Sequence, residues 1–78
     1  MTLPYDITVY NFKLQTIVGD FEYTYTRFDN KYVVFNLKDD WMLIYSHNIN
    51  SNKNITLYRG FIPKDITTFE ILLQLVKE

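Results

Sequence analysis

The stretch DFEYTYTRFDNKYVVF, residues 20–35, changes its pattern of side chains halfway along. Its first half carries an aromatic side chain at every second position, namely Phe21, Tyr23 and Tyr25, with polar residues between them. Successive side chains of a β-strand point to opposite faces of a sheet, so this alternation predicts a strand with one aromatic face. After the turn-forming residues Asp29 and Asn30, the second half is apolar at neighbouring positions. The stretch therefore predicts a β-hairpin whose second strand is apolar on both faces.

The length and composition of the chain limit the ways in which it can be stabilised. With 78 residues it is predicted to form a single α+β domain, residues 1–78. A domain of this size buries only about 60–65% of its unfolded surface. The absence of cysteine excludes disulfides and thiolate metal sites. Because hydrophobic residues make up 47% of the chain and aromatic residues 18%, we expect large aromatic side chains to fill the core.

Turn signals divide the chain into segments of the length that antiparallel strands require. The predicted strands are residues 7–18, 21–28, 32–37, 41–47 and 55–61. The C-terminal segment PKDITTFEILLQLVKE changes from a two-residue period to a helical one. The fold class is therefore predicted to be α+β, a five-stranded antiparallel β-meander with one C-terminal α-helix packed on one face. A small five-stranded β-barrel capped by the helix is the alternative.

The turns predict which side chains share a face of this sheet. A two-residue turn at Gly19 and Asp20 would pair Val18 with Phe21. Three-residue loops are expected at residues 29–31 and at residues 38–40. In the first of these loops, Asn30 or Lys31 would take the left-handed conformation. All three turns then place one set of side chains on what we call the inner face. This set is Tyr10, Phe12, Leu14, Val18, Phe21, Tyr23, Tyr25, Val33, Phe35, Leu37, Trp41, Leu43 and Tyr45, with Ile55 and Leu57.

The C-terminal helix has a recognisable start and one apolar stripe. Residues 67–70 read TTFE, a capping box in which Thr67 would be the N-cap. The stripe consists of Phe69, Leu72, Leu73 and Val76, which recur at helical spacing. We expect this stripe to pack on the inner face of the sheet.

The opposite, outer face is predicted to carry an apolar patch. Its members are Tyr32, Val34, Met42, Ile44 and Tyr58, with Thr24 and Thr26 at the rim. One short helix covers only one face of a sheet, so this patch would lie open at a scale at which exposure tends to mark interaction. Three interpretations remain: the sheet curls or residues 1–5 fold over the patch, two copies pack face to face, or another protein docks there. Leu75 points away from the helix stripe and could extend either interface.

The chain carries no pattern of residues that indicates catalysis or a cofactor. The only histidine, His47, is predicted at a strand end, where its neighbour Ser46 would point to the other face. The adjacent carboxylates Asp39 and Asp40 fall in a predicted turn, where Asp is favoured for local hydrogen bonds. No metal-ligand spacing or phosphate-binding loop occurs, so neither a metal nor a cofactor is expected and the protein is predicted not to be an enzyme.

Charge and hydropathy narrow the class of partner. The net charge of −1 comes from scattered single charges, which disfavours nucleic acid because its binding rests on clustered Lys and Arg. No run approaches the roughly 20 apolar residues of a membrane span. The N-terminal residues lack the features of a signal peptide, so a cytoplasmic location is expected.

These observations favour a small non-enzymatic protein-binding module that uses the outer patch. A short chain rich in Asn, Ile, Lys and Tyr is similar in composition to small proteins of bacteriophages and mobile elements that inhibit a host protein by occluding it. This resemblance implies an anti-defence inhibitor in the cytoplasm of a bacterial host. A structural homodimer is one alternative. A single-stranded nucleic-acid-binding protein, with Tyr32 and Tyr58 as stacking platforms, is the second.

Overall fold

The computed structural model of the chain describes residues 3–28 and 30–76 and contains one five-stranded antiparallel sheet with a C-terminal helix. The strands follow one another in the order of the sequence, and the sheet is not closed into a barrel. The elements are the 3₁₀ helix η1 (Ile7–Tyr10), strands β1 (Lys13–Val18), β2 (Glu22–Arg27), β3 (Lys31–Asn36), β4 (Trp41–Asn48) and β5 (Lys53–Phe61), helix α1 (Ile66–Leu72) and the 3₁₀ helix η2 (Leu73–Val76). The predicted meander with one C-terminal helix is therefore confirmed, and the capped barrel is not what the chain forms.

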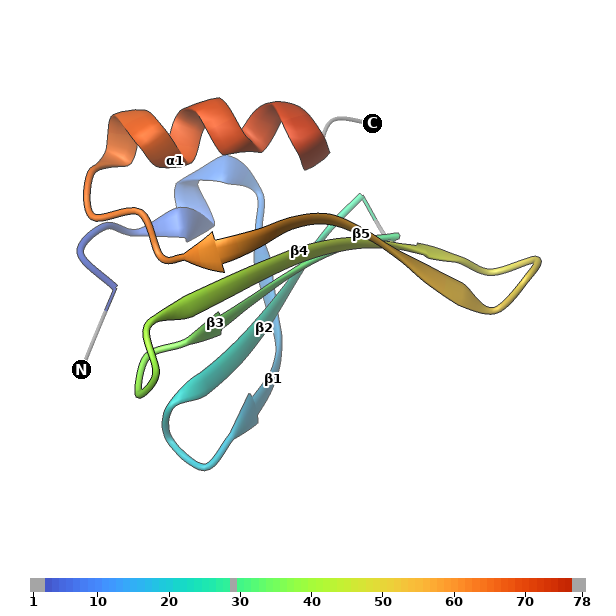
Figure 1. The fold of residues 1–78 in the computed structure, drawn as a ribbon, viewed down its shortest axis with the longest axis horizontal. Helices are drawn as coiled ribbons and strands as arrows, with labels where there is room; N and C mark the ends of the chain where they lie inside the picture. The colour runs from blue at the N-terminus through green and yellow to red at the C-terminus, as the bar shows by residue number, and fades with distance from the viewer. Residues whose placement is uncertain (1–2, 29, 77–78) are drawn as a thin grey trace.

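Helix α1 and the N-terminal segment lie over the same face of the sheet (Figure 1). The ring of Phe69 on α1 holds these layers together, because its centroid lies 5.0 Å from Tyr5, 6.2 Å from Phe12 and 6.2 Å from Phe35. The buried core around it consists of Ile7, Phe12, Val33, Phe35, Leu37, Met42, Ile44, Ile62, Phe69 and Val76. The predicted helix stripe is confirmed, since Phe69 and Val76 are buried while Leu72 and Leu73 pack against the same core.

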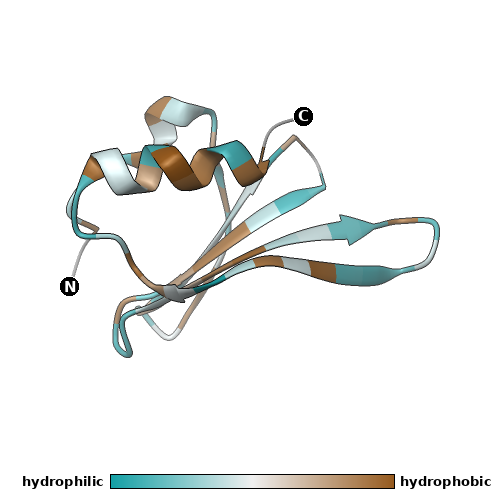
Figure 2. Ribbon diagram, turned by 45° about the horizontal axis from the view of Figure 1, so that its top comes forward, coloured by the Kyte–Doolittle hydropathy of each residue, from teal (hydrophilic) through white to brown (hydrophobic). Residues whose placement is uncertain are grey.

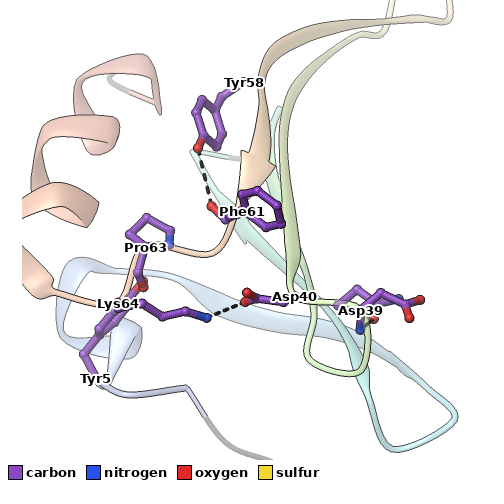
Figure 3. Close-up of polar contacts among 8 residues, drawn as sticks. Tyr5, Asp39, Asp40, Tyr58, Phe61, Pro63 and Lys64 are labelled. Atoms are coloured by element: carbon purple, nitrogen blue, oxygen red, sulfur yellow. Dashed lines mark hydrogen bonds and ion pairs between the residues drawn. The ribbon is translucent and has the colours of Figure 1, made fainter.

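The N-terminal residues form a 3₁₀ turn where a strand was predicted from residue 7. The carboxylate of Asp6 accepts a hydrogen bond from the backbone N–H of Thr8 at 3.0 Å and so caps the turn. Asn11 then takes the left-handed conformation with φ 69°, so strand β1 begins only at Lys13. The hydroxyl of Tyr5 donates to the carbonyl oxygen of Pro63 at 2.9 Å (Figure 3), and burial raises its pKa to about 12. The described residues 3–5 thus lie against the helix side of the molecule and not over the outer face.

The first hairpin differs from its prediction by one residue. Val18 pairs with Glu22, so the turn contains three residues instead of two, and both Gly19 and Asp20 are left-handed with φ of 57° and 62°. Because of the longer turn, Val18 lies on the outer face and not on the inner face as predicted. A bulge between Leu14 and Thr16 then returns Leu14 to the predicted inner face, opposite Tyr25.

The side chains of strands β2 and β3 lie on the predicted faces of the sheet, but their cross-strand partners differ from the prediction. Tyr23 pairs with Phe35, and Tyr25 pairs with Val33. The turn comes one residue earlier than predicted, since Lys31 already belongs to β3; Asp29 lies outside the described residues. Lys31 is not left-handed, and Phe28 takes that conformation instead with φ 58°. The alternative prediction, a left-handed Asn30, involves the backbone of Asp29 and lies outside the described residues.

The turn between β3 and β4 contains four residues instead of the predicted three, and this moves β4 by one position. Phe35 pairs with Met42 and Val33 with Ile44, so these two side chains of β4 lie on the inner face. Met42 is 0% exposed and Ile44 is 2% exposed. Their predicted place in an open outer patch is therefore wrong, and so is the inner position predicted for Trp41, Leu43 and Tyr45.

Tyr58 also lies on the inner face, contrary to prediction. It pairs with Ile44 across β4 and β5, and its side chain turns over Gly60 towards the helix side of β5 (Figure 3). A Cβ at Gly60 would stand 2.6 Å from the Tyr58 hydroxyl, so glycine leaves room for this ring. A one-residue bulge between Ile44 and Tyr45 exists further along the same pair of strands.

Helix α1 begins two residues earlier than the capping box indicated. Asp65, not Thr67, is the N-cap: its side chain accepts from the backbone N–H of Thr68 at 2.9 Å and also from the Thr68 hydroxyl. These hydrogen bonds, first that from the backbone, lower the pKa of Asp65.

The register of β4 predicts unequal costs for two neighbouring truncations. Met42→Ala should lower the free energy of unfolding by about 2–5 kcal/mol, because it opens a cavity in the core. Leu43→Ala, on the half-exposed outer face, should cost only about 1 kcal/mol. Urea denaturation followed by circular dichroism measures both values. An equal or larger loss in Leu43→Ala would contradict the register.

The N-cap predicts a pH-dependent effect at Asp65. Asp65→Ala should lower the urea midpoint, whereas Thr67→Ala should leave it unchanged. Because the folded pKa of Asp65 lies below its ordinary value of 3.8, the cap contributes fully above that pH and loses its contribution as the pH falls through the lowered value. The gap between wild type and Asp65→Ala should therefore close in acid, while Asp65→Asn should keep a cap that does not titrate. A gap that stays constant down to pH 2 would count against this account.

Candidate protein-binding face

The outer face of the sheet is ordered into three rows of side chains that run across all five strands. The first row is Val18, Glu22, Asn36, Trp41 and Phe61. The second row is Thr16, Thr24, Val34, Leu43 and Arg59. The third row is Lys13, Thr26, Tyr32, Tyr45 and Thr56. Within the described residues no helix lies against this face, since α1 and the N-terminal segment are both on the other side (Figures 1 and 2).

The centre of the outer face is apolar and closely packed. Val34 on β3 pairs directly with Leu43 on β4, and Val34 is only 8% exposed although none of the described elements covers it. Neighbouring side chains in the plane of the sheet therefore shield it. Polar Thr24 continues the row on β2 and forms one rim.

A stacked pair of tyrosines lies on one side of this centre. The rings of Tyr32 and Tyr45 have centroids 5.0 Å apart and an interplanar angle of 10°. Burial raises the pKa of Tyr45, and the nearby Tyr32 raises it further. The stack is thus a half-buried aromatic surface that carries two hydroxyls.

A second aromatic pair lies on the other side of the centre and borders a hollow. Trp41 pairs with Phe61 across β4 and β5, and Phe61 is 76% exposed. The hollow has a volume of about 380 Å³ and is lined by Trp41, Leu43, Arg59, Gly60 and Phe61. Figure 3 shows Phe61 on the side of β5 opposite Tyr58, away from the helix.

The polar end of the outer face lies where β4 and β5 extend past the rest of the sheet. Here a hollow of about 350 Å³ is lined by Tyr32, Tyr45, His47, Asn52 and Asn54. Nδ1 of His47 lies 2.7 Å from Oδ1 of Asn54, which is its cross-strand partner. The strands include Asn48 and Lys53, so the polar loop predicted at residues 47–54 is reduced to residues 49–52.

A larger hollow, of about 460 Å³, lies on the other side of the sheet. It separates the N-terminal segment from β2 and is lined by Leu3, Pro4, Tyr5, Asp6, Ile7, Tyr23, Tyr25 and Leu37. The one carboxylate in it, that of Asp6, already accepts hydrogen bonds from Thr8. This hollow belongs to the packing of the N-terminal segment.

The charges on the outer face are few and stand apart. Glu22 accepts a hydrogen bond from the Asn36 amide at 3.4 Å. Arg59 is exposed and makes no ion pair within residues 3–28 and 30–76. In the same ranges, no group of three or more His, Cys, Asp or Glu is placed to hold a metal ion.

The structure brings together only part of the predicted patch. Tyr32 and Val34 lie on the outer face with Thr24 and Thr26 beside them, whereas Met42, Ile44 and Tyr58 lie on the inner face. The prediction missed Trp41, Leu43, Tyr45, Arg59 and Phe61. The segment WMLIY is apolar in both phases of the strand, so only the length of the preceding turn could have identified the outward set.

Comparison with models of known protein families, with curated protein sequences and with solved structures finds no match to the chain. No helix in the described ranges is long and apolar enough to cross a membrane.

The stacked tyrosines predict a measurable interaction energy. In a double-mutant cycle of Tyr32→Ala and Tyr45→Ala, the losses in unfolding free energy should fail to add by about 0.5–1.5 kcal/mol, as for other aromatic pairs in contact. A cycle of Tyr32→Ala with the distant Phe61→Ala is the control and should be additive. Additive losses in the tyrosine cycle would show that the stack contributes no energy of its own.

Proposed function

We propose that the protein is a non-enzymatic module that binds another protein through its outer sheet face. The observation that carries this proposal is the position of α1 and the N-terminal segment on one side of the sheet, which leaves two aromatic pairs uncovered on the other. Contiguous exposed apolar surface of this kind tends to mark an interaction site.

The composition of the face supports a protein partner. Its side chains include Trp41, Tyr45 and Arg59, three residue types that are enriched at the energetic centres of protein interfaces. Thr24 and Thr26 provide a polar rim on β2, which is the usual surrounding of an apolar interface centre. Because the sheet holds these groups in fixed rows, little conformational entropy would be lost when a partner binds.

The mode of action that fits this face is occlusion. Apolar rings, one guanidinium and threonine hydroxyls supply contact area and hydrogen bonds to a partner surface. A module of this size could inhibit its partner by covering a surface that the partner needs, as expected for an inhibitor directed against a host protein.

Affinity capture with matched variants tests the proposal. The tagged protein, the double variant Tyr45→Ala with Phe61→Ala, and the control Val9→Ala with Ile71→Ala are each incubated with bacterial lysate, and retained proteins are identified by mass spectrometry. Val9 and Ile71 are exposed apolar residues outside the outer face, so the control also removes exposed apolar side chains. We expect a protein that the wild type and the control retain and the outer-face variant loses. Equal retention by all three forms would refute the assignment of this face.

Light scattering at micromolar concentration separates this function from self-association. A single chain has a mass of 9.4 kDa, and this mass is expected for the free protein. A stable dimer that Tyr45→Ala with Phe61→Ala converts to monomer would assign the face to a second copy of the chain instead.

A further inference from the structure

We infer that the hollow bordered by Trp41, Leu43 and Phe61 receives an apolar side chain of the partner, and that Arg59 pairs with a carboxylate beside that side chain. This inference rests on the proposed function and names the chemistry of the partner segment: an apolar residue adjacent to Asp or Glu.

The hollow is large enough to hold an apolar side chain of a partner. At about 380 Å³ it is near the lower end of the range of roughly 300–1,000 Å³ that small-molecule pockets occupy. It is open to one side and lies at the edge of the sheet, on β4 and β5. An apolar side chain projecting from a partner surface could enter it without any movement of the strands.

The lining of the hollow explains the apolar part of the inferred motif. Half-buried Trp41 and exposed Phe61 are cross-strand partners at the end of the outer face, and Leu43 lines the hollow on the side of the centre. Phe61 is among the most exposed large apolar side chains of the described chain. An apolar side chain of the partner would remove this surface from water, which is the main source of binding free energy at interface centres.

The charge at the rim explains the acidic part. Arg59 pairs with Leu43 across the strands and lines the hollow, so its guanidinium borders an apolar wall. A guanidinium binds a carboxylate through two parallel hydrogen bonds, and a charge pair is stronger beside an apolar surface than in open water. Arg59 makes no ion pair with any described residue, which leaves it available to a partner.

The carboxylates nearest in sequence to the hollow do not neutralise Arg59. Asp40, in the turn before Trp41, forms an ion pair with Lys64 (Figure 3). Asp39 lies in the same turn and is not part of the lining. The hollow therefore presents apolar surface with one positive charge and no negative charge of its own.

Selection from a displayed library of random peptides tests the inference without knowledge of the natural partner. Peptides are selected on the immobilised protein, and the affinity of a selected synthetic peptide is then measured for the wild type, Arg59→Gln and Phe61→Ala. Both residues are exposed, so both variants should keep the circular dichroism spectrum and urea midpoint of the wild type. If Phe61→Ala changes either of them, Phe61→Leu takes its place in the binding measurement.

We expect the selected peptides to share an aromatic or aliphatic residue next to Asp or Glu. Arg59→Gln and Phe61→Ala should each weaken binding at least about tenfold, and replacement of the acidic residue of the peptide by its amide should do the same. Lys13→Gln is the matched control, because Lys13 is also a cation of the outer face but lies on β1, at the opposite edge of the sheet. It should leave the affinity within about twofold of the wild type.

Several results would overturn the inference. These are selection of peptides without a carboxylate, an unchanged affinity in Arg59→Gln, or no enriched peptide at all. If selected peptides instead depend on Tyr32 and Tyr45, the outer face remains a protein-binding surface and only the hollow is wrongly assigned. Dimerisation of the free protein that Phe61→Ala abolishes would also overturn the inference, since a second copy would then fill the hollow.

Discussion

A single side-chain hydrogen bond accompanies the register on which both faces of the sheet depend. The amide oxygen of Asn36 accepts from the backbone N–H of Asp39 at 2.8 Å, inside the four-residue turn between β3 and β4. A side chain that bonds to the backbone three residues later stabilises such a turn locally. Because the side chains of a strand alternate, a turn shorter by one residue would exchange the buried Met42 and Ile44 for Trp41, Leu43 and Tyr45. Asn36 is itself buried, so the bond is protected from competition with water.

The architecture was predictable because it rests on patterns that repeat along the chain. Five apolar segments with turn signals between them indicate a meander, and the stripe from Phe69 to Val76 indicates a helix with one apolar face. The open outer face followed from the same reasoning, since one helix cannot cover both sides of a sheet. Tyr32 and Val34 were placed on that face because their strand and the turn before it keep the predicted alternation.

The parts that sequence reasoning missed are set by single hydrogen bonds and by close contacts. In WMLIY both possible sets of alternating side chains are apolar, so periodicity cannot choose between them. The difference lies in the length of the preceding turn, inside which Asn36 accepts its hydrogen bond from Asp39. The apolar pattern also fails to mark where η1 and α1 begin, because the carboxylates of Asp6 and Asp65 cap these two elements. The ring of Tyr58 fits where it does because Gly60, two residues later on the same strand, has no side chain. The periodic pattern of apolar residues does not reveal such a contact.

The bulge between Ile44 and Tyr45 divides the long hairpin of β4 and β5 into two parts of different character. On the core side of it, Ile44, Met42 and Tyr58 pack beneath the helix, so the strands there move with the body of the protein. On the other side, the hairpin continues past the layers that cover the sheet (Figure 1), and residues 48–56 are all exposed. Few buried contacts resist bending of this outer part, so its fluctuations should cost little free energy. A partner seated over Trp41 and Phe61 would therefore meet a rigid surface at one end of the face, and a compliant arm at the other that can adjust to its shape.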